Sequence, residues 1–495
     1  MPVRPRVGII GGGYSGAAFA IHLSRTSALP LDITIVEPSA GLGRGVAYGT
    51  TDPDHRTNGP TTTHSLYPDD PMHFDRWFRG GGGLAADPEC LDPQGRIFPR
   101  RGEMGRYVGD ELSRHQADNP SGSSIRHIRD RAVDTVADGD LYTVKLAGHD
   151  NLVVDLLAVT TSNAPPALLA PFRGAVAAHP AFYPDPWDLD RLSRIPADAR
   201  ILIIGTGLTM ADVALVVLRD RPEATVTALS RRGLMPQNQR QAPAGATFLE
   251  IMSRAAPAFV ARHGRPDTAR AILRALRADA RAMVAAGGEW QEAFDDVRDA
   301  AHQLWPLLSD QEQSRFVRHL WPWYETRRFR YPPQVDAKIQ GMTAAGRLIS
   351  QAAAVVDAAP KQARIEVTTR RRGQGAVSTA LFDAVINCTG PERKPSPTGD
   401  PFLQNLVSGG LLVNHPLGLG LRVDELCRAQ NSAGRHAARL RVIGPLARGR
   451  LGESNGVPHT ALHIMRVLPD ILAELEQVVP RAGATPSGVR DEAKT

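Results

Sequence analysis

Two glycine-rich segments of the chain have the residue types and the spacing that hold a pyrophosphate. The first is GIIGGGYSGA, in which Gly11, Gly13 and Gly16 form a G-x-G-x-x-G pattern. The first glycine permits a tight turn, the second leaves room for phosphate oxygens against the backbone, and the third lets a helix touch a strand. The helix that follows would direct its N–H groups and its positive dipole end at the phosphates. The pattern predicts a dinucleotide site.

An acidic residue follows the first glycine turn at the distance that a nucleotide requires. RVGII and ITIVE, on either side of the turn, are short, apolar and β-branched, which predicts two strands. Glu37 ends the second strand, 26 residues after Gly11, where a carboxylate accepts hydrogen bonds from ribose hydroxyls. We interpret this segment as an FAD or NAD site. The alternative is a tight strand–helix turn that holds no ligand.

The second segment, ILIIGTGLTM, repeats the design less completely. Gly205 and Gly207 occupy the first two positions, but Met210 stands at the third, so we expect helix and strand to lie slightly further apart. Arg231 follows Gly205 by 26 residues, and an arginine there accommodates the 2′-phosphate of NADP. The segment is either an NADP-type site or a structural strand–helix unit. Two such turns in one chain suit a protein in which NAD(P)H reduces a flavin.

Composition and charge exclude several other classes of protein. Of the 495 residues, 58 are Lys or Arg and 52 are Asp or Glu, and the arginines are not interleaved with aromatic residues along one stretch, which argues against nucleic-acid binding. Three cysteines without a CxxC pair exclude a dithiol relay and suit a reducing compartment. Cys388 and Cys427 are expected to be small core residues.

The sequence predicts no membrane anchor and no metal site. No apolar run approaches the roughly 20 residues of a membrane span, and MPVRPR leads straight into a strand without a signal peptide, so we expect a cytoplasmic protein. His64 and His73 lack the helical spacing of metal ligands. The oligomeric state is left open.

The order of the patterns predicts an α/β fold with two Rossmann-like dinucleotide-binding domains and a helical insertion. Residues 41–78, rich in Gly, Pro, Asp and Thr, are expected to form either a surface loop or a flap over a flavin, and GGGG at 80–83 a flexible linker. The expected divisions are an FAD-binding domain at 1–168 and 385–480, an NAD(P)H-binding domain at 169–244 and 331–384, a helical insertion at 245–330, and a disordered tail at 481–495.

Aromatic and basic residues crowd together near the end of the expected insertion, in FVRHLWPWYETRRFRYPPQ. The rigid, always charged guanidinium of Arg328 or Arg330 suits a planar or carboxylate anion. Trp321, Trp323 and Tyr324 offer faces on which a purine could stack. The alternative is an arginine-rich helix end whose charges are simply solvated.

The motifs, taken in order, resemble those of FAD- and NAD(P)-binding monooxygenases, and most of all the FAD-dependent urate hydroxylases and the aspartate N-hydroxylases that form nitrosuccinate. The resemblance covers about residues 6–470 and rests on GIIGGGYSGA, GRGVAY, NGP with YPDDPMHF, DPW, IGTGLTM, SRRG, INCTGPE, HPLGLGL and IGPLARG. The chain departs from many relatives at Thr160–Ser162, at Asn58–Thr61, and at Phe329, where relatives often have a histidine. These departures bear on the substrate more than on the flavin.

The resemblance implies a cycle in which NAD(P)H reduces FAD, O₂ forms a C4a-hydroperoxyflavin, and its distal oxygen passes to a small electron-rich anion. Urate, hydroxylated to 5-hydroxyisourate, is the leading expectation for the substrate. The alternatives are an aspartate-like amino-acid N-hydroxylase, or a flavin-dependent NAD(P)H reductase or sensor that inserts no oxygen. The resemblance favours NADH, whereas Arg231 favours NADPH.

The motifs and the resemblance together nominate the site residues. Arg328, Arg330 and His64 are expected to act on the substrate. The residues expected to bind FAD or NAD(P)H are Gly11, Gly13, Tyr14, Ser15, Gly16, Glu37, Arg44, Gly45, Tyr48, Asn58, Val133, Gly205, Gly207, Leu208, Thr209, Arg231, Gly390 and Gly444.

Overall fold

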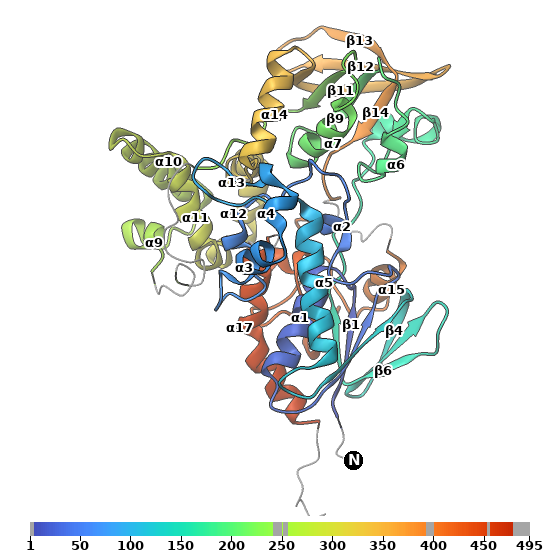
Figure 1. Ribbon diagram of the computed structural model, residues 1–495, viewed down its shortest axis with the longest axis vertical. Helices are drawn as coiled ribbons and strands as arrows, with labels where there is room; N and C mark the ends of the chain where they lie inside the picture. Colours follow the sequence, from blue (N-terminus) through green and yellow to red (C-terminus); the bar gives the residue numbers. More distant parts are fainter. Residues whose placement is uncertain (1–3, 241–249, 251–255, 393–399, 453–455, 479–495) are drawn as a thin grey trace, which may run out of the picture.

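The computed structural model describes residues 4–240, 250, 256–392, 400–452 and 456–478. It has two large sheets at opposite ends of its long axis, and a group of helices beside the junction between them (Figure 1). The tail from residue 481, expected to be disordered, lies outside the described residues. The prediction of an α/β fold built from Rossmann-like units is confirmed.

The first sheet joins strands from both ends of the chain. Its order is β15-β16-β7-β1-β2-β3, in which β1 pairs in parallel with β2 and β7. The inner strands are buried on both faces, which explains their unbroken apolar runs. The bounds are β1 Arg6–Ile10, β2 Asp32–Val36, β3 Ser124–Ile128, β7 Leu156–Val159, β15 Arg428–Gln430 and β16 His436–Val442.

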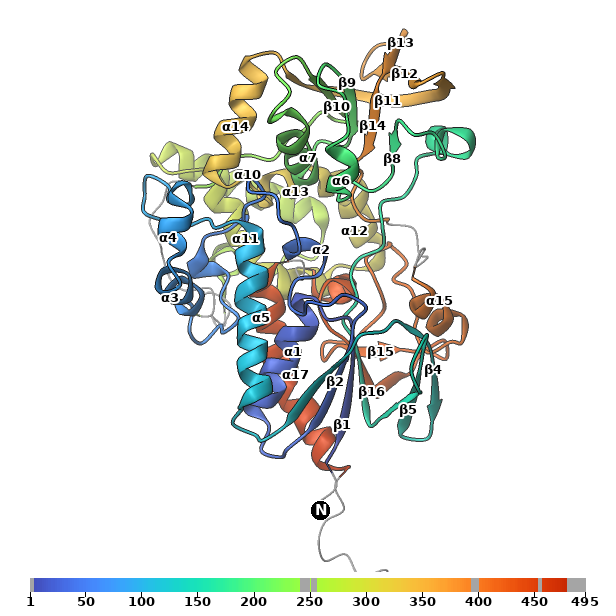
Figure 2. The same ribbon diagram turned by 45° about the vertical axis from the view of Figure 1, so that its right-hand side comes forward.

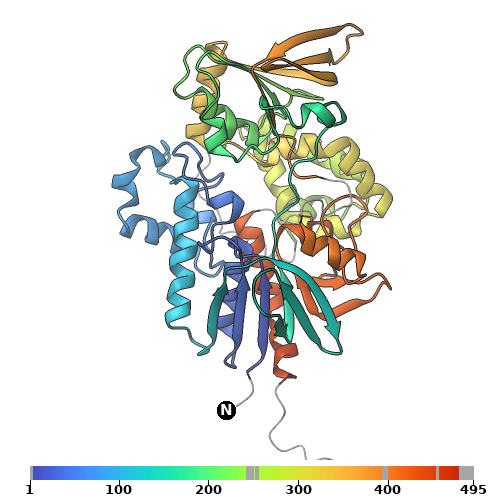
Figure 3. The same ribbon diagram turned by 90° about the vertical axis from the view of Figure 1, so that its right-hand side faces the viewer.

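Three long helices cover one face of this sheet (Figure 2). They are α1 (Tyr14–Thr26), which connects β1 to β2, α5 (Arg101–Ala117) and α17 (Val457–Glu476). A small antiparallel sheet lies beside the first sheet (Figure 3), with α15 (Pro401–Ser408) packed on it. Its strands are β4 Ala132–Asp138, β5 Leu141–Leu146 and β6 Leu152–Val154.

The second sheet has the order β13-β12-β11-β10-β9-β14-β8. The helices α7 (Leu208–Leu218) and α14 (Pro333–Ala344) pack beside it. The strands are β8 Phe182–Tyr183, β9 Arg200–Ile204, β10 Thr225–Ser230, β11 Leu348–Lys361, β12 Arg364–Arg371, β13 Val377–Phe382 and β14 Ala384–Asn387. Because β14 is buried and pairs in parallel with β9, the boundary expected at residue 385 is too early: the chain returns to the first sheet only after residue 387.

The described residues between β10 and α14 form helices and no strand of either large sheet. They enclose a core of their own, which includes Phe259, Ile272, Val297 and Trp305. A π-helical turn over Phe316–Leu320 begins the aromatic–basic stretch, and such turns are frequent at functional sites. The helices are α9 Ala258–His263, α10 Ala269–Ala285, α11 Gln291–Leu304, α12 Asp310–Arg315 and α13 Trp321–Arg328.

The segment 41–86 is more regular than the sequence predicts. It contains α2 (Gly45–Tyr48), α3 (His73–Gly80) and α4 (Gly83–Ala86), so the prediction of a flexible linker at 80–83 is wrong. A Cβ atom on Gly83 would lie 2.6 Å from Cε2 of Phe78, so this glycine permits two helices to pack closely. The remaining short elements are η1 Thr61–Thr63, η2 Pro88–Cys90, η3 Ala170–Phe172, η4 Gly174–Val176, α6 Leu189–Leu192, η5 Trp305–Leu307, η7 Pro445–Ala447 and α16 Arg448–Leu451.

Two expectations about the core and the surface can be compared with the structure. Cys388 and Cys427 are buried and free, as predicted for small core residues. Within the described ranges, every helix is too short or too polar to cross a bilayer.

The third glycine of the first turn is expected to be a stability determinant. A Cβ atom on Gly16 would lie 2.0 Å from the carbonyl oxygen of Gly11, and backbone cannot move aside cheaply. We therefore expect Gly16→Ala to lower the free energy of unfolding of the flavin-free protein by about 1–3 kcal/mol. Gly13→Ala is the matched control, because its Cβ would approach nothing closer than 3.4 Å. Equal stability of the two variants in urea unfolding would contradict this prediction.

Candidate functional site

A cleft of about 1470 Å³ opens where the two sheets and the helical segment meet. The first domain contributes the segment 45–64, the second contributes the start of α7 and the segment 184–190, and the helical segment contributes the end of α13. Nine of the residues nominated from the sequence line the cleft: Gly45, Tyr48, Asn58, His64, Leu208, Thr209, Arg328, Arg330 and Gly390. The cleft therefore collects residues of both expected cofactor sites and of the expected substrate site.

In the first glycine turn, a side chain would clash at the first and third glycines and would have room at the second. Gly11 has φ +106°, and a Cβ there would lie 2.9 Å from the Thr160 carbonyl oxygen, so this turn requires glycine. A Cβ on Gly16 would clash with the Gly11 carbonyl oxygen, 2.0 Å away. Gly13 precedes α1, and the nearest atom to a Cβ there would be Cα of Gly45, at 3.4 Å. The backbone at Gly13 is thus accessible to a pyrophosphate at the N-terminus of α1, as an FAD site requires.

Glu37 closes the same turn. Its Oε2 accepts a hydrogen bond of 2.8 Å from the N–H of Gly12, and its Oε1 accepts from the N–H and the hydroxyl of Ser39. Since a carboxylate oxygen has two lone pairs, Oε2 retains one for a ribose hydroxyl. Glu37 therefore lies where the sequence predicts it, and it also braces the glycine turn.

The other residues nominated for FAD lie at different depths around this turn. Tyr14 and Ser15 are buried in the first turn of α1, and a Cβ on Gly444 would lie 2.4 Å from the Ser15 hydroxyl. Arg44 is exposed immediately before α2. Val133 lies in β4, away from the lining of the cleft, and its carbonyl accepts a hydrogen bond from Asn405.

The second glycine turn is built in the same way at its first two positions. Gly205 has φ +118°, and a Cβ there would lie 2.1 Å from the Cys388 carbonyl oxygen. A Cβ on Gly207 or on Gly390 would meet no atom within 4 Å, so the space in front of α7 is open. Met210 is fully buried in the core beneath α7. A methionine at the third position therefore fills the helix–sheet contact and leaves the phosphate-facing part of the turn free.

Arg330 and Arg328, nominated together, have different surroundings. Arg330 is buried and makes a bidentate ion pair with Asp295 at 3.0 and 3.2 Å, and it also donates to the carbonyls of Gln291 and Arg327. This network anchors the end of α13 to α11. Arg328 is half-buried, with its guanidinium 5.0 Å from the ring centroid of Phe329. Of the two, Arg328 is the better candidate to meet an anion in the cleft.

His64 lies on the same part of the cleft as Arg328. Burial lowers the pKa of His64 to about 4; a hydrogen bond with the Pro60 backbone opposes this shift, and the nearby charge of Arg328 adds to it. The Thr63 hydroxyl lies 3.1 Å from its Nδ1. The imidazole is therefore neutral near pH 7 and contributes hydrogen bonding without a charge.

The aromatic residues expected to stack a planar substrate are not in the cleft wall. Trp321 and Tyr324 pack around Phe316, with ring centroids 6.2 and 5.8 Å away, and Trp323 is exposed. Tyr48, Trp187 and Phe329 line the cleft instead. The expectation that the Trp and Tyr of this stretch form a stacking platform is therefore wrong, because the rings of Trp321 and Tyr324 complete the packing of the helical segment and Trp323 is exposed outside the cleft lining.

Sequence reasoning missed a buried ion pair that joins the two domains across the cleft. Arg101, the first residue of α5, binds Asp212 of α7 through Nη1–Oδ2 and Nη2–Oδ1 contacts of 2.6 and 3.1 Å. Arg101 also donates to the Arg56 carbonyl at 2.8 Å, and to Asn58 at 3.5 Å. A lone carboxylate in the apolar stretch LTMADVALVV was the available signal. The pair fixes the helix of the second glycine turn against the first domain.

Flavin binding at the first turn can be tested through its open position. Replacing Gly13 by leucine would fill the space in front of α1 and block the approach of the pyrophosphate. We expect the purified wild type to be yellow, with tightly but non-covalently bound FAD, and the purified Gly13→Leu protein to be colourless. Circular dichroism would show whether the variant folds. A folded variant with full flavin content would show that FAD does not bind at this turn.

The Arg101–Asp212 pair is expected to control flavin reduction. A displacement of about 1 Å between reacting groups can cost on the order of 100-fold in rate, so we expect Arg101→Gln and Asp212→Asn each to slow reduction of bound FAD by NAD(P)H by about 10- to 100-fold. The double variant should cost less than the product of the two, because it removes the same contact. Arg25→Gln, which breaks an exposed ion pair with Asp69 inside the first domain, is the control. Stopped-flow rates that match the wild type would contradict the prediction.

The comparisons with known proteins agree with this geometry. Residues 8–164 match a family model described as FAD-NAD(P)-binding. A search of curated proteins gives no match.

Solved structures share the fold over nearly the whole chain. An ornithine N-hydroxylase from Kutzneria sp. 744, with reduced FAD, NADP⁺ and L-ornithine, is 17% identical, with a TM-score of 0.62, over 96% of this chain and 100% of that one. The reduced ornithine hydroxylase of Pseudomonas aeruginosa is 15% identical (TM-score 0.61, 96% and 100%). L-lysine 6-monooxygenase of Pseudomonas syringae is 16% identical (TM-score 0.61, 96% and 99%). The chain thus has an FAD-NAD(P)-binding domain at residues 8–164 within a fold that it shares with these flavin hydroxylases.

Proposed function

We propose that the protein is an FAD-dependent monooxygenase that consumes NAD(P)H and O₂ and hydroxylates the amino nitrogen of a small amine carrying a carboxylate, such as aspartate. The observation that carries the proposal is the cleft. It is lined by Leu208 and Thr209 of the second glycine unit and by Gly45, which lies next to Gly13 of the first glycine turn. Its third wall places Arg328 beside the neutral His64. Two dinucleotides and an anionic substrate can therefore meet in one space.

The proposed reaction divides between the cofactors and the chain. Bound FAD would accept a hydride from NAD(P)H and activate O₂, and no side chain of the protein can do either. The N-termini of α1 and α7 hold the two pyrophosphates. The Arg101–Asp212 pair joins α7 to α5, which packs against α1. The walls exclude water from the reacting centre.

The polar groups of the cleft suit a substrate with charges of both signs. Arg328 can bind a carboxylate through its planar fork. The segment 184–190 adds Asp185, Asp188 and Asp190 to another wall, where carboxylates attract an ammonium group. His64 offers a neutral ring nitrogen for a hydrogen bond. An amino acid therefore fits the charge pattern better than a planar monoanion does.

Two observations weaken urate as the substrate. Of the stacking residues expected from the sequence, Trp321 and Tyr324 pack inside the helical segment and Trp323 is exposed outside the cleft lining. The structures that share the fold include hydroxylases whose names specify ornithine and lysine. Both observations favour hydroxylation of nitrogen over hydroxylation of a purine carbon.

The substrate class can be tested by following NAD(P)H oxidation, O₂ uptake and peroxide release together, with L-aspartate, L-ornithine, L-lysine and urate. We expect aspartate to accelerate oxidation several-fold and to yield a hydroxylated amine with little peroxide. Arg328→Gln should raise the KM for this substrate by about 10- to 100-fold, because a charge-assisted hydrogen bond is worth about 1.5–3 kcal/mol. Arg327→Gln, the neighbouring arginine outside the cleft lining, should leave KM unchanged.

The opposite outcomes are equally specific. If only urate accelerates NAD(P)H oxidation without peroxide release, urate is the substrate and the proposed N-hydroxylation is wrong. Flavin reduction without oxygen insertion into any of the four compounds would indicate a reductase. Slow or absent reduction by NAD(P)H would indicate a flavin-based sensor.

A further inference from the structure

Five arginines lie around one edge of the second sheet. Arg231 and Arg232 follow β10, and the other three, Arg370, Arg371 and Arg372, lie at the end of β12 and just beyond it. All are exposed except Arg232, which is half-buried. The ion pairs found within the described ranges involve none of the five. Positive charge is therefore concentrated here without a carboxylate from the described chain to offset it.

The sheet register brings the two groups of arginines to the same level. Ser230 of β10 lies opposite Ala352 of β11, and Ala353 lies opposite Arg371 of β12. The N–H of Arg372 donates to the Ala352 carbonyl at 2.8 Å. Adjacent strands lie about 4.8 Å apart, so the ends of β10 and β12 are separated by roughly two strand spacings. Arginine side chains from both ends can converge on one small anion.

The loop after β10 packs closely against β11. Gly233 has φ +63°, and a Cβ on it would lie 2.8 Å from the N–H nitrogen of Ala352. The Ser350 hydroxyl donates to the Gly233 carbonyl at 3.3 Å. Only glycine permits this approach, which fixes Arg231 and Arg232 beside β11.

The same edge carries the second glycine turn. The N–H of Gly205 donates to the Leu229 carbonyl at 2.8 Å, and the Thr206 hydroxyl donates to the Ser230 hydroxyl at 2.9 Å. In a strand–turn–helix–strand unit of this kind, the adenosine ribose lies at the end of the second strand, which here is β10. A phosphate monoester on that ribose would lie at the level of the arginines.

We propose that Arg371 and Arg372, from the β12 end, join Arg231 and Arg232 in binding the 2′-phosphate of NADPH. The β11–β12 hairpin is then the second half of the phosphate site, and the protein prefers NADPH to NADH. A dianionic phosphate matches guanidinium forks in charge and geometry. The inference rests on the proposed function only in that the second glycine turn binds a nicotinamide dinucleotide.

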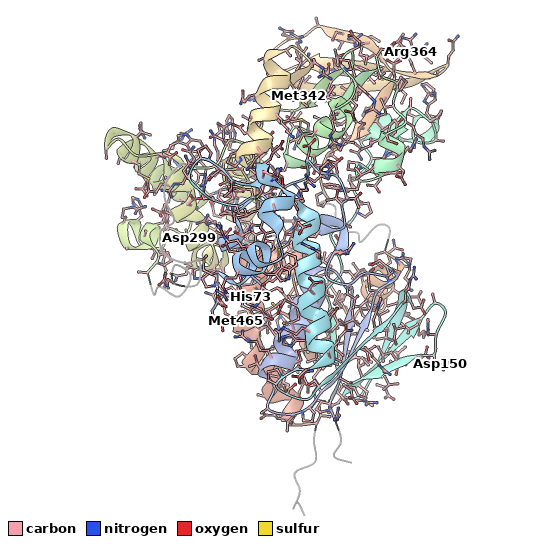
Figure 4. The ribbon with its side chains drawn as sticks, in the orientation of Figure 1. His73, Asp150, Asp299, Met342, Arg364 and Met465 are labelled. Atoms are coloured by element: carbon pink, nitrogen blue, oxygen red, sulfur yellow. The ribbon has the colours of Figure 1, made fainter. Side chains whose placement is uncertain are left out.

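β12 provides its own matched control. Arg364, labelled in Figure 4, begins the same strand and is exposed. It lies opposite Lys361 in the β11–β12 register, at the other end of β12 from Arg371, and its guanidinium is 3.8 Å from Asp383. Arg364→Ala removes one arginine from the same strand without altering the proposed site.

The experiment is calorimetric titration of the FAD-loaded, full-length protein with adenosine 2′,5′-bisphosphate and with 5′-AMP. We expect the wild type to bind the bisphosphate at least about ten-fold more tightly than 5′-AMP. Arg371→Ala/Arg372→Ala should remove most of that difference and leave 5′-AMP affinity unchanged, and Arg231→Ala should do the same. Arg364→Ala should match the wild type. The double variant should also raise the KM for NADPH about ten-fold or more, and not that for NADH.

Each contrary result has a separate meaning. If the double variant keeps the wild-type preference for the bisphosphate, Arg371 and Arg372 have no part in the site. If the wild type binds 5′-AMP and the bisphosphate equally, the 2′-phosphate site is wrong while nucleotide binding at the second turn stands. If neither nucleotide binds, this inference fails together with the nicotinamide part of the proposed function. The flavin spectrum and thermal unfolding show that each variant is folded.

Discussion

The buried ion pair between Arg101 and Asp212 is the contact on which the arrangement of the cleft depends. Each glycine turn is determined within its own domain, but a hydride can pass only if the two turns face each other at one fixed separation. Arg101 belongs to the first domain and holds the segment 56–58 as well, while Asp212 lies one turn inside the helix of the second glycine unit. Because both side chains are buried, the loss of either would leave an uncompensated charge, which makes other domain orientations costly.

The two glycine turns show which parts of the design are constrained by backbone and which by side chains. At Gly11 and Gly205 a positive φ and a carbonyl oxygen within 3 Å of a Cβ leave no other residue possible without strain. The third position differs, because Gly16 lets α1 approach the Gly11 carbonyl, whereas Met210 packs its side chain into the core beneath α7. The contact of helix and sheet can therefore be made in two ways, and the open face at Gly13 and Gly207 is common to both.

The sequence predicts the parts of the site that depend on local backbone, and it fails for those that depend on contacts between distant segments. The glycine turns, Glu37 and the α/β fold follow from spacing within about 30 residues. By contrast, Arg330 looked available in the linear sequence, and only the fold shows that Asp295 of α11 occupies its guanidinium. The Arg101–Asp212 pair spans 111 positions, and neither residue belongs to a motif. Composition alone predicts a flexible linker at 80–83, because it does not reveal the Phe78 ring beneath Gly83.

The charge of the third wall follows from how its arginines are compensated. Arg298 pairs with Asp295 and Asp299, and Arg330 pairs with Asp295 again. Both ion pairs lie on this side of the cleft, and burial keeps the neighbouring His64 neutral. The guanidinium of Arg328 lies near the same imidazole, in a half-buried position where solvent screens its charge less than at the surface. A contact between Arg328 and a substrate carboxylate would therefore be stronger there than in water, and the bidentate pair of Arg330 with Asp295 fixes the end of α13 that carries Arg328.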